Sequence, residues 1–224
     1  MKKLLSSVLA MTLILGVTGC AKKSNYNKIS KKIIEAAESE LDAEEASKKQ
    51  KKSYLDDSGD PTSGDPIYAS YTQDELEEFT MDGMLDEESL KNMTLVGASE
   101  NEEKYMCILL EFIDKDDAED FFEEISENNS DMYSAKEIKS LKKLGDVEYA
   151  VDDEDDDEYS YIMTLDVKDY EGESISTALH MKIDGNVVIY MGYFSRTTSD
   201  MLDEFIDFSK EAGLVDFEKM LEDA

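Results

Sequence analysis

The chain of 224 residues contains no tryptophan, one histidine and two cysteines. A single histidine cannot form the HExxH pair of zinc proteases, and the two cysteines are too far apart for a CxxC zinc motif. The GxSxG motif that marks the nucleophile of α/β-hydrolases does not occur either. The lack of tryptophan argues against a sugar cleft lined by indole rings. We therefore assign no catalytic residue and favour a non-enzymatic protein, with an unrecognised extracellular hydrolase as an open alternative.

Basic residues are also few. The chain has 23 lysine and arginine residues against 55 aspartate and glutamate residues, and its formal net charge is −32. Such a negative field repels the phosphates of nucleic acids, whose binding depends on basic side chains. Composition therefore excludes nucleic acid as a partner.

The N-terminus has the pattern of a removable export signal. Lys2 and Lys3 precede an apolar run from Leu4 to Val17, which is shorter than the roughly 20 residues of a membrane-spanning helix. A basic start, a short apolar run and small residues at its end are typical of a secretory signal peptide. We predict that residues 1–19 are removed and that no later segment spans a membrane.

The end of this signal, Val17-Thr18-Gly19-Cys20, resembles the lipobox of bacterial lipoproteins. The resemblance implies that Cys20 receives a thioether-linked diacylglycerol and becomes the first residue of the mature chain, with or without a palmitate on its new amine. It also implies export and anchoring at the outer face of the cytoplasmic membrane, or at the outer membrane of a two-membrane cell. The membrane partner then binds through the lipid on Cys20.

If Cys20 carries lipid, the remaining Cys107 has no partner for a disulfide within the chain. The folded part must then be stabilised by its hydrophobic core, for which about 150 residues are sufficient. Because Cys107 lies in the most apolar segment, we interpret it as a core residue rather than a nucleophile.

The mature chain divides into two predicted parts. Residues 20–66 form the lipid anchor and a stalk or linker, with an amphipathic helix over about 27–52. The sequence leaves open whether this helix stands free or docks on the folded body. The segment 57–66 contains both prolines of the chain and repeats Ser-Gly-Asp-Pro, so we place the domain boundary there.

Residues 67–224 are expected to form an extracytoplasmic α+β domain. Its predicted core is a mostly antiparallel sheet that is packed by helices on one face. The periodicity of apolar residues predicts strands over 93–98, 105–113, 147–151, 159–167, 175–183 and 187–194, and helices over 86–92, 114–127, 134–144, 199–213 and 215–221, with a short helix opened by a Thr72 and Glu75 capping box.

Seven consecutive carboxylates at 152–158 form the most distinctive charged segment. Calcium takes six to eight oxygen ligands, so we consider Asp152, Asp153, Asp155 and Asp157 as a weak metal site. The EF-hand pattern fails here, because no glycine and no closing carboxylate occur at the required spacing. The alternatives are a divalent-cation-binding lipoprotein that acts through the loop 152–158, with calcium as the candidate ion, and a solvated hairpin turn that only condenses cations loosely.

The remaining candidates have ordinary structural interpretations. Alternation places His180 on the polar side of its strand with Lys182, which predicts exposure to solvent. We expect Arg196 to form an internal ion pair. Four tyrosines either pack in the sheet or line a groove, namely Tyr159, Tyr161, Tyr190 and Tyr193. The leading hypothesis is a non-enzymatic module that binds an unknown protein or small ligand.

Overall fold

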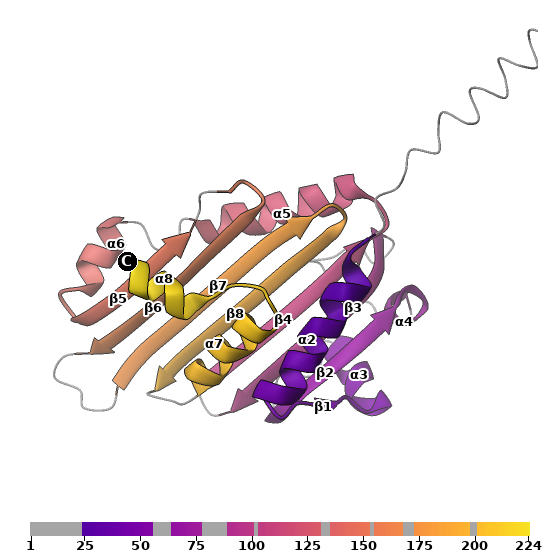
Figure 1. Ribbon diagram of the computed structural model, residues 1–224, viewed down its shortest axis with the longest axis horizontal. Coiled ribbons are helices and arrows are strands. Elements are labelled where there is room, and N and C mark those ends of the chain that lie inside the picture. The colour runs from indigo at the N-terminus through magenta and orange to yellow at the C-terminus, as the bar shows by residue number, and fades with distance from the viewer. Residues whose placement is uncertain are drawn as a thin grey trace, which may run out of the picture.

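Figure 1 shows a computed structural model of the chain, which describes residues 24–55, 64–77, 89–100, 103–130, 135–152, 155–167, 173–197 and 201–224. The predicted export signal and Cys20 lie outside these residues. The elements are α2 (Tyr26–Glu40), β1 (Glu44–Glu45), α3 (Lys48–Leu55), β2 (Gly64–Thr72), α4 (Gln73–Glu77), β3 (Leu90–Glu100), β4 (Glu103–Phe112), α5 (Lys115–Ser130), α6 (Ala135–Leu141), β5 (Gly145–Asp152), β6 (Glu158–Val167), β7 (Glu173–Asp184), β8 (Val187–Thr197), α7 (Met201–Glu211) and α8 (Phe217–Asp223).

The strands form one eight-stranded sheet in the order β1-β2-β3-β4-β8-β7-β6-β5. Every neighbouring pair is antiparallel except β1 and β2. The two most apolar segments of the sequence, β4 and β8, pair at the centre, where both faces of a strand are covered. The predicted α+β class with a mostly antiparallel sheet is confirmed.

Helices α2, α7 and α8 pack on one face of the sheet, and α5 covers part of the opposite face (Figure 1). The first face contributes Cys107, Met191 and Tyr193 to a core with Phe205 of α7 and Phe217 of α8. The second face packs against Phe122 and its neighbours on α5. Because both faces are apolar over the central strands, the alternation of polar and apolar residues is strict only toward the edges of the sheet.

Helix α2 docks on the folded body, which answers a question that the sequence left open. Ile33 is fully buried in the core shared with α7. The Thr94 hydroxyl on β3 forms 2.7 Å hydrogen bonds with the hydroxyls of Tyr26 and Ser30. Burial raises the pKa of Tyr26 to about 12, although hydrogen bonding of Tyr26 with Thr94 and with Ser30 opposes the shift. The folded unit that the structure describes therefore includes α2, and the extent of a stalk within 20–66 stays a prediction.

The predicted helix over 27–52 is divided into two. It stops at Glu40, and Asp42 then takes a left-handed backbone conformation with φ of 50°. Ala43 donates its N–H to the Ala37 carbonyl at 3.0 Å, which closes the end of α2. The chain next adds the short strand β1 and resumes as α3. Helical periodicity continues through 41–47, so it could not reveal this interruption.

Two further local differences concern strands. The predicted boundary at 57–66 treats Gly64 to Pro66 as a turn, but 64–72 forms β2, which pairs antiparallel with β3. Residues 90–92 belong to β3 rather than to the predicted helix over 86–92, whose first residues lie outside the described chain. The predicted capping box is present, since Glu75 accepts hydrogen bonds from the Thr72 N–H at 2.9 Å and the Thr72 hydroxyl at 3.1 Å.

Within the described ranges, no helix combines the length and the apolar character that crossing a bilayer requires.

Candidate functional site

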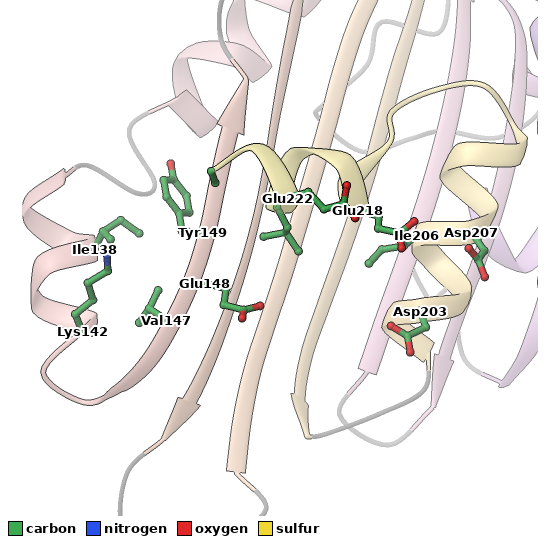
Figure 2. A pocket seen from close by; sticks show the side chains of 12 residues that line it. Ile138, Lys142, Val147, Glu148, Tyr149, Asp203, Ile206, Asp207, Glu218 and Glu222 are labelled. Carbon is green, nitrogen blue, oxygen red and sulfur yellow. The ribbon is translucent and has the colours of Figure 1, made fainter.

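A hollow lies where the edge strand β5 meets three helices. It has a volume of about 830 Å³ and is open to solvent. We call it the β5 groove. Its lining comes from α6, β5, α7 and α8 (Figure 2): Ile138, Lys142, Val147, Glu148, Tyr149, Asp203, Ile206, Asp207, Glu218, Leu221, Glu222 and Ala224.

The wall formed by α7 and α8 is fixed by core packing and by local hydrogen bonds. Phe217, the first residue of α8, is fully buried and stacks on Phe205 of α7 with ring centroids 5.8 Å apart. Asp216 caps α8 by accepting the Lys219 N–H at 3.1 Å. The Ser209 hydroxyl donates to the Val215 carbonyl at 2.7 Å, which ties the two helices together. The α7 and α8 wall of the groove is therefore tied to the core.

Apolar side chains and carboxylates share the lining of the groove. Ile138, Val147 and Leu221 provide apolar surface, and Tyr149 adds an aromatic ring (Figure 2). Five carboxylate side chains surround this surface, namely Glu148, Asp203, Asp207, Glu218 and Glu222. Lys142 is the single basic side chain in the lining. A ligand that carries positive charges on apolar stems can pack the stems on the apolar surface and pair the charges with the carboxylates.

Most of these carboxylates have their charge available. Lys210 lies 3.0 Å from Glu218 and 3.5 Å from Asp216, so it neutralises one of the five in part. The other four form no salt bridge with any residue in the part of the chain that the structure describes. Their mutual repulsion is relieved when a cation enters.

Strand β5 brings an edge of the sheet into the groove. It is eight residues long and, among the described strands, pairs with β6 alone. Its central residues, Val147 to Tyr149, line the groove, with α6 beside the strand and α8 across it (Figure 2). An edge strand presents backbone N–H and C=O groups that can pair with a further strand.

His180 is not where the sequence placed it. The prediction of solvent exposure is wrong, because the face that carries His180 is covered by helices and the side chain is fully buried. The Ser160 hydroxyl lies 2.9 Å from Nδ1 of His180, and Nε2 has no hydrogen-bond partner among the described residues. Burial, helped by the charge of Lys182, lowers the pKa of His180 to about 3.

This pair does not have the geometry of a catalytic triad. Glu158 approaches the same nitrogen, Nδ1, at 3.9 Å, whereas a triad uses one ring nitrogen for the nucleophile and the other for the acid. Ser160 is buried as well, so its hydroxyl is closed to a substrate in this structure. Ser160 and His180 therefore form an internal polar contact within the core.

Cys107 lies on β4 within the core, as predicted. It is a free cysteine, and burial raises its pKa to about 12. A thiol with so high a pKa is protonated at neutral pH and is a poor nucleophile. Arg196 is exposed, and its guanidinium lies 5.7 Å from the centroid of the Phe194 ring, which is a cation–π contact in place of the expected ion pair.

The four candidate tyrosines do not share one groove. Tyr193 packs with Phe205 of α7, with ring centroids 5.3 Å apart, on the face that α2, α7 and α8 cover. Tyr159, Tyr161 and Tyr190 belong to the opposite face. The packing interpretation applies to Tyr161 and Tyr193, which are both buried. The tyrosine of the β5 groove is Tyr149, which the sequence did not single out.

The acidic loop forms the turn between β5 and β6. Asp152 ends β5, and Asp155 and Asp157 lie exposed in the turn. Asp153 lies outside the described residues. Where side chains are described, no three histidine, cysteine, aspartate or glutamate residues are grouped to hold a metal ion. Calcium binding at Asp152, Asp153, Asp155 and Asp157 stays a prediction.

One buried carboxylate outside the groove is structural. Glu111 on β4 accepts hydrogen bonds from Lys91 at 2.9 Å and from Asn92 at 2.6 Å. Burial raises the pKa of Glu111, but these hydrogen bonds outweigh it and the pKa is lowered overall. The cluster fastens β3 to β4 and keeps the carboxylate ionised.

Sequence reasoning missed the β5 groove as a whole. Its residues come from two segments, 138–149 and 203–224, that are more than 50 positions apart, and acidic residues occur along the entire chain, so no local pattern distinguishes those that converge. The one usable signal is the prediction that 147–151 is a short strand followed by the acidic run 152–158.

No protein-family model and no curated protein matches this chain. Among solved structures, the extracellular domain of PknH from Mycobacterium tuberculosis is similar, with 13% sequence identity and a TM-score of 0.31. The match covers 67% of this chain and 83% of that domain. We draw no conclusion about function from a likeness at this level.

Proposed function

We propose that this chain is an exported lipoprotein, held at a membrane by lipid on Cys20, and that it acts as a non-enzymatic binding module. We further propose that the β5 groove receives a cationic partner. The first part is supported by the signal-like N-terminus and the Val17-Thr18-Gly19-Cys20 motif. The second part is supported by the groove itself.

The observation that carries the binding proposal is the combination of five carboxylates with apolar surface in one groove. Lysine and arginine side chains consist of an apolar stem and a charged head, so they match both components. A negative groove also repels anionic ligands and speeds the approach of cationic ones. The occupant that fits best is a lysine- or arginine-rich segment of a protein.

Calorimetric titration with tetralysine tests the binding proposal on the full chain in nonionic detergent micelles. We expect the Glu148→Lys/Glu222→Lys double variant to bind tetralysine at least about tenfold more weakly, because two attractive charges become repulsive. The matched control is Glu211→Lys, an exposed position on α7 outside the groove. The proposal fails if Glu211→Lys weakens tetralysine binding, per charge changed, as much as the double variant does.

Membrane fractionation tests the anchor. The wild-type chain is expected in the membrane pellet, with a mass increased by its lipid, and Cys20→Ala is expected to leave the pellet. Two or more acyl chains give stable attachment, whereas none leaves only weak electrostatic contact. A Cys20→Ala variant that pellets as firmly as the wild type, or an unmodified thiol at Cys20 in the wild type, contradicts the anchor.

A further inference from the structure

The two sides of β5 differ in chemistry. Ala150 belongs to the core face that α7 and α8 cover, and alternation along the strand places Glu148 on the same side. Tyr149 packs with the opposite face, which Val147 therefore shares. In a strand added beside β5, alternate side chains would face opposite sides of the sheet. One set would lie next to carboxylates, and the other set would lie next to apolar groups.

The helices that line the groove strengthen this division. Glu218 and Glu222 of α8 lie with Glu148 on one side of the groove, and Ile138 of α6 lies with Val147 and Tyr149 on the other (Figure 2). Opposite charges and apolar pairs on neighbouring strands are stabilising. The sequence that fits this edge alternates basic and apolar residues.

A second copy of this chain is a poor occupant of the same edge. Antiparallel pairing of two β5 strands about their centres would bring the Glu148 carboxylates of the two copies close together, and like charges on neighbouring strands are destabilising. Charged residues on edge strands are a common means of preventing self-association. The edge is protected against this acidic chain but stays open to a basic one.

From these observations we infer that the β5 edge takes up an extended, basic segment of a partner protein, which adds to the sheet as a further strand. This inference rests on the proposed function and specifies how the cationic partner binds. In this mode the backbone hydrogen bonds supply affinity, and the alternate side chains supply specificity. The helices α6 and α8 confine the segment on its two sides.

Two capped peptides of identical composition test the predicted alternation. The first has the sequence Lys-Val-Lys-Val-Lys-Val-Lys, and the second has the order Lys-Lys-Val-Val-Lys-Lys-Val. Both carry the same charge, so purely electrostatic binding gives equal affinities. Strand addition predicts that the alternating peptide binds about tenfold more tightly, and that it slows hydrogen exchange of the amides of 147–151.

N-methylation of the alternating peptide tests the backbone hydrogen bonds directly. A strand directs the N–H groups of alternate residues to opposite sides, so only one set pairs with β5. One peptide is methylated at the three valine nitrogens and the other at the inner lysine nitrogens. We expect one of them to lose affinity about tenfold or more and the other to change far less.

The results separate this inference from the proposed function. Tetralysine could bind in the groove while the alternating and reordered peptides have equal affinities and the two methylated peptides lose affinity equally. In that case strand addition is wrong and the binding function stands. If neither tetralysine nor the peptides bind, the proposed function fails and the inference fails with it. Selective loss in one methylated peptide, together with slower exchange in β5, supports strand addition.

Discussion

Ser160 on β6 and His180 on β7 lie opposite each other, with the serine hydroxyl 2.9 Å from Nδ1 of the histidine. Both side chains are buried, and the second ring nitrogen of His180 has no partner among the described residues. Protonating this ring would place a charge in a core that cannot solvate it, so the folded state holds His180 neutral.

The buried His180 makes the stability of the fold sensitive to acid. In the unfolded chain His180 binds a proton below pH 6.5, whereas in the folded chain its pKa is about 3. Between these values the unfolded state binds more protons, so stability falls as the pH falls. We expect His180 to contribute a loss of about 2–3 kcal/mol in the free energy of unfolding between pH 7 and pH 4.5.

Urea unfolding of the wild type and of His180→Gln at both pH values measures this contribution. The many carboxylates affect both proteins alike, so the difference between the two proteins isolates the histidine. The wild type should lose more stability than the variant over this range. Equal losses would show that His180 is not kept neutral by the fold.

Because α2 docks on the folded body, we expect a single substitution in its buried face to lower the free energy of unfolding substantially. Ile33 is fully buried between the sheet and α7, so Ile33→Ala should lower the free energy of unfolding by about 2–4 kcal/mol through lost burial and a residual cavity. Lys31→Ala, at an exposed position of the same helix, is the matched control and should change stability by less than about 0.5 kcal/mol. A free-standing helix would make both substitutions equally mild.

Calcium titration decides between the two interpretations of the acidic loop. A specific site would stabilise the fold by about 2.7 kcal/mol at a calcium concentration of 100 Kd, and Asp155→Asn/Asp157→Asn would remove this gain. Because these two side chains are exposed in the turn, we expect a smaller response that sodium reproduces at equal ionic strength. A calcium-specific rise in Tm that the double variant abolishes would contradict this expectation.

The sequence predicted the strands and helices whose apolar residues alternate or repeat most regularly. Strands β4 to β8 and helices α5, α6 and α7 all occur close to their expected ranges. Strand β2 was missed because Gly64 and Pro66 indicate a turn, although Ile67, Ala69 and Tyr71 alternate beyond them. The alternation of these three residues is visible in the sequence, but the domain boundary placed at the prolines of 57–66 drew attention away from it.

Features that depend on contacts between distant segments could not be predicted. The break in the helix at Asp42 becomes favourable because β1 pairs with β2. His180 is buried because α2, α7 and α8 cover its face of the sheet, which no pattern within its own strand reveals. The β5 groove combines four elements whose acidic residues look ordinary in a chain of this charge.

The central claim is that cations bind in the β5 groove and do not simply spread over an acidic surface. Nuclear magnetic resonance with a spin-labelled tetralysine tests it most directly, because the label broadens only nearby amide signals. We predict strong broadening at 147–149 and 218–222, and weak broadening at the exposed acidic positions of α5, namely Glu119, Asp120, Glu123 and Glu124. Equal broadening at both places would contradict the claim.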